Sequence, residues 1–144
     1  MKIYIASSWK NQHAVELLTT LLRDRGHTVL SFVENNQGEQ VGHLATNGRK
    51  PIPFDEWVYS DRGTRSFDYD TKAAMTSDLV VYIAPSGKDA AAEVGMAWAK
   101  GVKIFGLYAK GEDFGLMRRL IHWHDDHRQL IVSIDLLQAE MVNA

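Results

Sequence analysis

The chain has 144 residues, of which 16 are lysine or arginine and 18 are aspartate or glutamate, so its formal net charge at pH 7 is −2. This length predicts one domain that is large enough to bury a core, and the balanced charge argues against binding to a nucleic-acid polymer. The lack of cysteine excludes a disulfide framework and a thiolate nucleophile. The chain opens on a strand pattern instead of a signal peptide, and no apolar run approaches the roughly 20 residues of a membrane span. We therefore expect a small cytoplasmic protein with no membrane partner.

The first third of the chain alternates between strand and helix patterns. Lys2 to Ala6 predicts a first strand, and Ser7 to Asn11 a polar turn. The apolar stripe from Val15 to Leu22 predicts a helix that ends at Gly26, and His27 to Phe32 predicts a second strand. A parallel β-α-β opening follows from this order.

Periodicity is lost between residues 33 and 66, where Gly, Asn, Gln, Arg and two prolines accumulate. Because such a segment is too long for an ordinary connection, we expect a functional loop, with a short helix near Phe54 to Tyr59. Phe67 to Ser77 then predicts a helix that is capped by Ser66 or Asp68.

The next unit is a strand, a glycine-containing turn, a helix and another strand. Leu79 to Ile83 is a short apolar run, typical of a strand buried on both faces of a parallel sheet. Ser86 or Asp89 can cap the following helix, Ala90 to Lys100, and Val102 to Tyr108 predicts the next strand.

After Tyr108 the pattern predicts a short helix from about Asp113 to Ile121, a final strand near Gln129 to Ile134 and a terminal helix from Asp135. Five strands alternating with helices predict an α/β fold, a flavodoxin-like (Rossmann-like) three-layer sandwich with a five-stranded parallel sheet of order 2-1-3-4-5. We expect a single domain spanning residues 1–144, with a long loop insertion at about 33–66. Right-handed crossovers would place all the βα turns at one edge of the sheet.

Glu93 is the most informative residue, because it is the one charged side chain between Ala90 and Ala99 and lies close to that edge. The positive end of the helix favours an ionised carboxylate, which could attack the anomeric carbon of a sugar. The alternative is a solvated surface glutamate. It is weakened because Val94, Ala97 and Trp98 already supply the apolar stripe of the helix.

At these residues the sequence resembles the nucleoside 2-deoxyribosyltransferase family and the related nucleotide N-glycosidases. The resemblance covers the domain apart from residues 32–66, and is carried by Ile3 to Ser7, Asp78 to Ile83, Ser86-Gly87 and the Glu-x-Gly signature at Glu93 to Ala97. It implies that Glu93 attacks the sugar, expels the base and forms a glycosyl-enzyme that another base or water resolves. It also implies a homo-oligomer, a dimer or larger, in which residues 141–143 or the long loop could complete a neighbouring site.

The resemblance implies further catalytic residues at the same edge. Tyr4 is similar to the family residue that touches the glutamate, although it could equally be a core aromatic. Asp68 and Asp70 open the predicted helix of residues 67–77, and the family uses an aspartate of this region to contact the base or support its protonation. Either aspartate could instead be a simple helix cap.

Candidate substrate-binding residues have similar double interpretations. The polar turn after the first strand offers hydroxyls, helix-start amides and a cation, at Ser7, Ser8, Lys10 and Asn11. These groups could hold a sugar hydroxyl or a 5′-phosphate. Alternatively, Ser8 or Asn11 could merely cap the next helix. Trp57 and Tyr59 could close over a base as lid residues, or anchor their loop to the core. The remaining candidates are Ser86, Gly87, Asp89 and Met96.

Three histidines near the end of the chain, His122, His124 and His127, suggest a metal site together with Asp125 and Asp126. Their spacing does not match a metal-binding helix, so we interpret this stretch as a solvated loop. We expect neither a metal nor a cofactor.

Other functions of this fold class lack their signatures. Residues 6–11 replace the Gly-x-Gly-x-x-Gly of a dehydrogenase, and Ala6 and Pro85 stand where a phosphoacceptor receiver needs acidic residues. Two alternatives stay open: an NAD-cleaving or nucleotide-sensing domain of the Toll/interleukin receptor type, and a non-catalytic nucleotide-binding module. The expected partner is a small nucleoside or nucleotide, whose base, sugar and acceptor the sequence leaves open.

Overall fold

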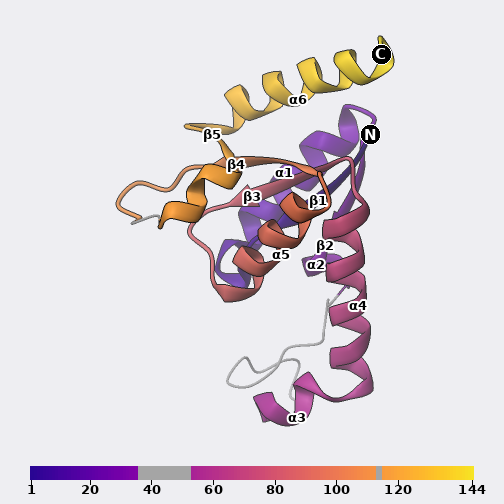
Figure 1. Ribbon diagram of the computed structural model, residues 1–144, viewed down its shortest axis with the longest axis vertical. Coiled ribbons are helices and arrows are strands. Elements are labelled where there is room, and N and C mark those ends of the chain that lie inside the picture. Colours follow the sequence, from indigo (N-terminus) through magenta and orange to yellow (C-terminus); the bar gives the residue numbers. More distant parts are fainter. Residues whose placement is uncertain (36–52, 113–114) are drawn as a thin grey trace.

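The computed structural model describes residues 1–35, 53–112 and 115–144. Its centre is a parallel five-stranded sheet (Figure 1), whose strand order, β2-β1-β3-β4-β5, is the order predicted from the sequence. The strands are β1 (Lys2–Ala6), β2 (Thr28–Ser31), β3 (Leu79–Ile83), β4 (Lys103–Leu107) and β5 (His122–His124).

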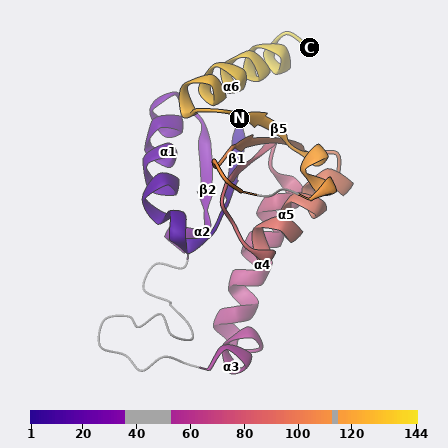
Figure 2. The ribbon, with the colours of Figure 1, turned by 90° about the vertical axis from the view of Figure 1, so that its left-hand side faces the viewer.

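Helices cover both faces of the sheet, with α1 on one side and α4 and α5 on the other (Figure 2). The α-helices are α1 (Gln12–Asp24), α2 (Phe32–Asn35), α3 (Phe54–Val58), α4 (Asp61–Thr76), α5 (Lys88–Ala99) and α6 (His127–Val142). Two 3-10 helices, η1 (Trp9–Asn11) and η2 (Leu116–Leu120), precede α1 and β5. The predicted three-layer α/β architecture is therefore confirmed.

The alternation of side chains along each strand divides the core into two parts. In β1, Ile3 and Ile5 pack with α1 and α6, whereas Tyr4 and Ala6 pack with α4 and α5. The central strand β3 is buried along its whole length, as its continuous apolar run predicts. Strands β1, β2, β3 and β4 thus each contribute side chains to both packing surfaces.

Helix α4 begins earlier than the sequence pattern predicts. The hydroxyl of Ser60 accepts a hydrogen bond from Gly63 N (3.1 Å), so Ser60 is the N-cap, and the predicted caps Ser66 and Asp68 both lie inside the helix. A Cβ on Gly63 would lie 2.1 Å from Trp57 O, which explains why a glycine stands in the first turn of α4, against the end of α3.

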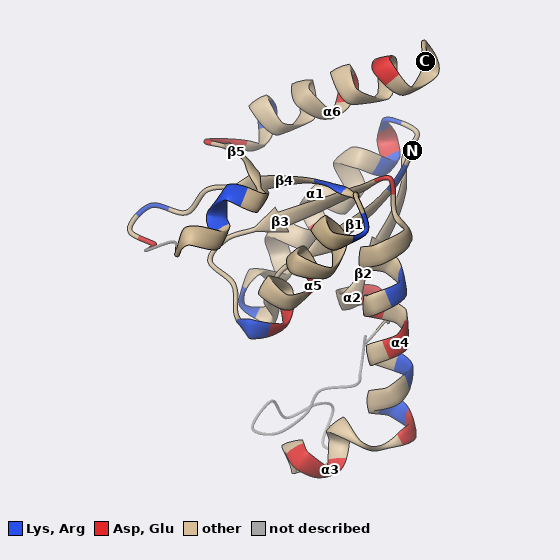
Figure 3. Ribbon diagram, in the orientation of Figure 1, with Lys and Arg blue, Asp and Glu red and all other residues tan. Residues whose placement is uncertain are grey.

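The expected long loop of residues 33–66 is therefore helical over much of its described part. The short helix predicted near Phe54 is confirmed as α3, and α4 already covers residues 61–66. Residues 36–52, in which the remainder of the predicted loop falls, lie outside the described residues. The polar composition of α4, with charges of both signs along it (Figure 3), hid its helical period.

The C-terminal assignment was wrong. The last strand is β5, at the histidines, and the segment predicted as a strand, Gln129 to Ile134, belongs to α6. Asp126 caps this helix by accepting hydrogen bonds from Arg128 N (2.8 Å) and Gln129 N (3.0 Å). Leu130 and Ile134 are buried one turn apart, and this helical spacing was mistaken for a strand.

The solvated loop expected at the histidines is also corrected. His122 and His124 belong to β5, and His124 is buried with Nε2 2.7 Å from Ser133 Oγ. Among the described residues, no group of three or more His, Cys, Asp or Glu side chains could hold a metal ion. The helix predicted from about Asp113 is shorter in the structure, where η2 covers residues 116–120, and residues 113–114 lie outside the described part.

The molecule carries different elements at the two ends of its long axis. Helix α6 lies at one end, and α3 with the first turns of α4 extends away from the sheet at the other (Figures 1 and 2). Among the described helices, none is long and apolar enough to span a membrane.

Candidate active site

A buried carboxyl and a buried tyrosine form the centre of the site. Glu93 lies in the second turn of α5 on the side that faces the sheet, and is 8% exposed. Tyr4 of β1 is fully buried, and its hydroxyl donates a hydrogen bond of 2.5 Å to Glu93 Oε1. The alternative of a solvated glutamate is therefore wrong. Tyr4 is both a core aromatic and the contact of the glutamate, so its two interpretations hold together.

Burial dominates the ionisation of Glu93. Its pKa is raised to about 8, mainly by desolvation and also by the charges of Asp70 and Asp89, while the hydrogen bond from Tyr4 acts in the opposite direction. Burial therefore favours the protonated carboxyl in the free protein, against the ionised form that the helix start was expected to favour. The first turn of α5 is too distant to outweigh desolvation, and its N-cap is Gly87 instead of Ser86 or Asp89.

Asp70 is the second carboxyl of the site. It lies in the third turn of α4, and burial raises its pKa to about 7, against a lowering hydrogen bond with Tyr4 and with a further rise from the charge of Asp89. Its Oδ1 is buried and has no hydrogen-bond partner among the described residues. Asp68, by contrast, is exposed. Of the two aspartates that the sequence could not separate, only Asp70 approaches Glu93.

Tyr4 links these two carboxyls. Its own pKa is raised well above 10, first by burial and then by the charges of Glu93 and Asp70, so its hydroxyl keeps its proton and acts as a donor. Two neighbouring carboxyls with raised pKa values can divide the roles of nucleophile and acid between them. Such perturbed pairs are characteristic of functional sites.

A cavity of about 460 Å³ opens beside this pair, between α3, α4 and α5. This volume lies within the range of small-molecule sites. Five predicted site residues line it: Trp57, Asp70, Asp89, Glu93 and Met96. Tyr59, which was considered with Trp57, also lines it but is 88% exposed. The other lining residues are Phe54, Val58, Gly63, Thr64, Ser66, Phe67, Thr71 and Ala92.

The polar turn after β1 does not line this cavity. The Asn11 side-chain amide donates to Pro85 O (2.7 Å) and to Ser7 Oγ (3.0 Å), and Ser7 Oγ donates to Ile83 O (2.8 Å). These bonds join the ends of β1 and β3. Ser8 Oγ accepts from Lys10 N (3.2 Å) and so caps η1, which bears out the capping interpretation for Ser8. A role of Lys10 in binding phosphate stays a prediction.

Ser86 and Gly87 lie outside the cavity lining as well. Gly87 is the N-cap of α5 and therefore sets where that helix starts, while Ser86 follows the buried end of β3. Their predicted role in substrate binding stays a prediction.

The sequence argument missed the wall that α4 contributes to the cavity. Gly63, Ser66, Phe67, Asp70 and Thr71 recur every three or four residues and lie on one side of the helix. This spacing would have predicted the wall if Ser60 had been identified as the cap. Instead, the first two of these positions, Gly63 and Ser66, were counted as loop.

The fold is similar to that of a 2-deoxyribosyltransferase from the psychrotolerant bacterium Bacillus psychrosaccharolyticus, with 25% sequence identity, a TM-score of 0.66 and coverage of 90% of each chain. It is also similar to the CMP N-glycosidase BcmB from Clostridium botulinum, with 17% identity, a TM-score of 0.59 and coverage of 94% of this chain and 99% of that one. A conserved protein from Enterococcus faecalis V583 is similar with 20% identity, a TM-score of 0.53 and coverage of 94% and 87%.

No protein-family model and no curated protein matches the chain. At their level of identity, the second and third structures support the fold alone. The resemblance predicted from the sequence is nevertheless confirmed: in its fold, the chain is nucleoside 2-deoxyribosyltransferase-like.

Proposed function

We propose that the chain is an enzyme that cleaves the N-glycosidic bond of a nucleoside or nucleotide and transfers the ribosyl or deoxyribosyl group to water or to another base. The observation that carries this proposal is the Tyr4–Glu93 hydrogen bond, buried at the wall of a ligand-sized cavity that also contains Asp70. The similarity to a 2-deoxyribosyltransferase over nine-tenths of both chains supports the same chemistry.

In the first step Glu93 is the nucleophile. Its hydrogen-bonded oxygen, Oε1, is held by Tyr4, so we assign the attack on the anomeric carbon to Oε2. The bond from that carbon to the base nitrogen breaks, and its electron pair leaves with the base. Asp70, in its protonated form, gives its proton to the departing base.

In the second step Asp70 acts as the base. It takes a proton from water or from the incoming base, the acceptor attacks the anomeric carbon, and the bond to Glu93 breaks. The reactive form of the free enzyme therefore holds one proton for the two carboxyls, on Asp70, and leaves Glu93 ionised. Because the pKa of Glu93 is the higher of the two, this is the less populated arrangement of that proton before substrate binds. Because their pKa values are about 7 and about 8, the pair titrates as a coupled unit near neutral pH.

The rest of the cavity supplies the binding surface. Trp57 and Met96 offer an aromatic and a thioether face for the base. Asp89 lies at the start of α5 on the same cavity. Closure by Trp57 and Tyr59 would exclude water from the sugar. A homo-oligomer that completes the site belongs to the same proposal.

Product analysis tests this function. The protein is incubated with nucleosides, nucleoside monophosphates and NAD, with and without a second base, and the products are separated by chromatography. Free base with free sugar indicates hydrolysis, and a new nucleoside indicates transfer. Release of nicotinamide from NAD alone would support the Toll/interleukin receptor type of activity, and binding without products would contradict catalysis.

A further inference from the structure

The cavity beside Glu93, which we call the Glu93 cavity, combines acidic and aromatic side chains. Three carboxyl groups line it, those of Asp70, Asp89 and Glu93, and no lysine, arginine or histidine is among the described residues that do so. We infer that this cavity selects nucleosides whose base carries a positive charge, such as an N-alkylated nucleobase or a pyridinium. The inference rests on the proposed function and names the class of substrate on which that function acts.

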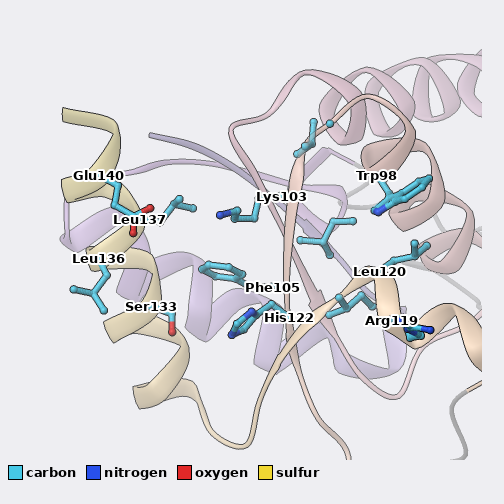
Figure 4. Close-up of a pocket in the computed structure, with 14 residues that line it drawn as sticks. Trp98, Lys103, Phe105, Arg119, Leu120, His122, Ser133, Leu136, Leu137 and Glu140 are labelled. Atoms are coloured by element: carbon cyan, nitrogen blue, oxygen red, sulfur yellow. The ribbon is translucent and has the colours of Figure 1, made fainter. Parts of the chain in front are cut away.

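A second hollow of the chain has the opposite charge. It has a volume of about 580 Å³ and lies between α6 on one side and the end of α5 on the other (Figure 4). Lys103, Arg119 and His122 line it, and Glu140 is the one acid among its lining residues. The acids and the cations are therefore separated between the two hollows, so a cationic ligand is favoured in the Glu93 cavity and not in this second hollow.

The carboxyls of the Glu93 cavity are spread around it. Asp70 comes from the third turn of α4, whereas Asp89 and Glu93 come from the first two turns of α5. No group of three or more His, Cys, Asp or Glu side chains in the described chain could hold a metal ion. A metal ion needs its oxygen ligands close together, but a charge delocalised over an aromatic ring does not. A cavity of about 460 Å³ therefore suits an organic cation.

Two of these carboxyls keep an oxygen available to a ligand. Glu93 is 8% exposed and lines the cavity, and Tyr4 occupies its Oε1. The other oxygen, Oε2, has no hydrogen-bond partner among the described residues. Asp70 Oδ1 is also buried without a partner among them. Buried carboxyl oxygens in this state are stabilised by a ligand that brings a positive charge.

The ionisation of the two carboxyls agrees with this picture. Burial, with no described cation to offset it, raises the pKa of Asp70 to about 7 and that of Glu93 to about 8. A positive charge in the cavity lowers both pKa values, because it stabilises the ionised forms. A cationic base therefore increases the population of the reactive form, in which Glu93 is ionised, whereas a neutral base does not.

Aromatic side chains supply the other half of a site for an organic cation. The rings of Phe54 and Trp57 in α3 have centroids 6.4 Å apart and an interplanar angle of 31°, and Phe67 of α4 lines the same cavity. Phe54 is 61% exposed and Phe67 is 66% exposed, so both rings are open to a ligand. The face of an aromatic ring attracts a cation, and aromatic cages bind quaternary ammonium ligands for this reason.

A cationic base also fits the chemistry assigned to Glu93. When the glycosidic bond breaks, its electron pair enters the base and cancels the positive charge, so the base leaves neutral and needs no proton. Glu93 Oε2 forms its bond to the anomeric carbon in the same step. Asp70 can stay ionised beside the charged ring. It then takes a proton from the attacking water as the bond from the anomeric carbon to Glu93 breaks.

An uncleavable pair of ligands tests the selection of charge directly. The pyridinium 1-methylnicotinamide is a cation without a sugar, and nicotinamide is its neutral counterpart. Calorimetric titration of the full chain should give a Kd about 10- to 100-fold lower for the cation, because the carboxylates and the aromatic rings both favour it. Equal affinity for the two ligands, or tighter binding of nicotinamide, would overturn the inference.

Two aspartate variants locate the selection in the cavity. Asp89→Asn removes a cavity charge that takes part in no proposed proton transfer, so it should reduce the preference for 1-methylnicotinamide about 3- to 10-fold and leave nicotinamide binding unchanged. Asp68→Asn is the matched control, since Asp68 is an exposed aspartate outside the cavity lining, and it should keep the full preference. Equal losses in the two variants would assign the effect to net charge and refute the site.

Turnover separates this inference from the proposed function. 1-Methyladenosine and 3-methylcytidine carry a cationic base at neutral pH, and adenosine and cytidine are their neutral counterparts. After subtraction of the uncatalysed rate, KM should be about 10-fold or more lower for the cationic member of each pair. Nicotinamide riboside in a parallel assay shows whether a pyridinium is accepted as well as an alkylated nucleobase.

The outcomes of the two assays are distinct. Cleavage of neutral nucleosides with equal KM for both members of each pair overturns the inference and leaves the proposed function in place. Selective binding of 1-methylnicotinamide with no base released from any nucleoside contradicts the proposed function, but supports the selection of charge by the cavity.

Discussion

The two faces of the sheet use the same strands for different purposes. On the face of α1 and α6, Ile3 and Ile5 of β1 pack into an aliphatic core. On the face of α4 and α5, the intervening Tyr4 reaches the carboxyl of Glu93. Both faces contribute stability through apolar burial, but the second also holds carboxyls with raised pKa values and buried polar atoms that lack partners among the described residues. A polar group left in this state costs stability, which natural proteins tolerate mainly where it serves function.

The sharpest test of this contrast is Glu93→Gln. The substitution keeps the shape of the side chain and an acceptor for Tyr4, but removes the nucleophile. We expect a loss in kcat of at least about 10³-fold with the fold retained. Glu16→Gln, on the exposed side of α1, is the control and should leave the rate unchanged. Steady-state rates within a few-fold of wild type for Glu93→Gln would remove this residue from the mechanism.

The two aspartates of α4 provide the next test. Asp70→Asn should lower kcat by about 10²- to 10⁴-fold, because it removes the group that protonates the base. Asp68→Asn should have no measurable effect, since Asp68 is exposed and does not line the cavity. A substrate with a leaving group that needs no protonation should recover much of the rate in Asp70→Asn. Equal losses of kcat in the two variants would show that lining the cavity does not identify the functional aspartate.

The sequence predicted the order of the strands in the sheet more completely than the residues that surround Glu93. The strand order follows from the alternation of strand and helix patterns along the chain. The contact of Tyr4 with Glu93 was implied by the family resemblance, since the local pattern alone fits a core aromatic equally well. Local patterns could not decide which of Asp68 and Asp70 lies near Glu93. The answer depended on where α4 begins, and the cap at Ser60 lies in a stretch whose polar composition concealed the helix.

The ionisation of Glu93 could not be predicted either. The helix start favours the charged form by a local effect, but the burial that outweighs it comes from α4 and β1, which are distant in the sequence. The error at β5 had a similar origin. Only its pairing with β4 makes a strand of His122 to His124, and no aliphatic pattern marks it.

The pH dependence of stability should differ between the two faces. The folded carboxyl of Glu93 keeps its proton up to about pH 8, whereas in the unfolded chain it loses the proton near its ordinary value of 4.5. Between these values the native state binds more protons, so its stability falls as the pH rises. Glutamine has no proton to lose, so this pH dependence should be absent from Glu93→Gln. Above about pH 8 the free energy of unfolding of Glu93→Gln should exceed that of wild type by an amount on the order of a few kcal/mol. Below pH 4.5 the difference should vanish.

A core substitution on the opposite face supplies the comparison. Leu22→Ala, at a fully buried position of α1, should lower the free energy of unfolding by about 2–5 kcal/mol at every pH at which the chain folds. Urea unfolding at about pH 5 and about pH 9 measures both effects. A constant difference between Glu93→Gln and wild type across this range would mean that burial does not perturb Glu93.

The smallest expected effect concerns Trp57 on the cavity wall. Its indole Nε1 is buried and has no hydrogen-bond partner among the described residues, so a bound base can supply an acceptor. Trp57→Phe keeps an aromatic face but removes the donor, and the loss of one hydrogen bond should raise KM about 2- to 10-fold with kcat nearly unchanged. Ligand binding should change the tryptophan fluorescence of wild type but not of Trp57→Phe. Trp98→Phe, near the end of α5 and outside the lining of the Glu93 cavity, is the control and should keep both the fluorescence response and KM. If the fluorescence of Trp57→Phe changed on ligand binding as that of wild type does, Trp57 would not contact the base, and α3 would only form a wall of the cavity.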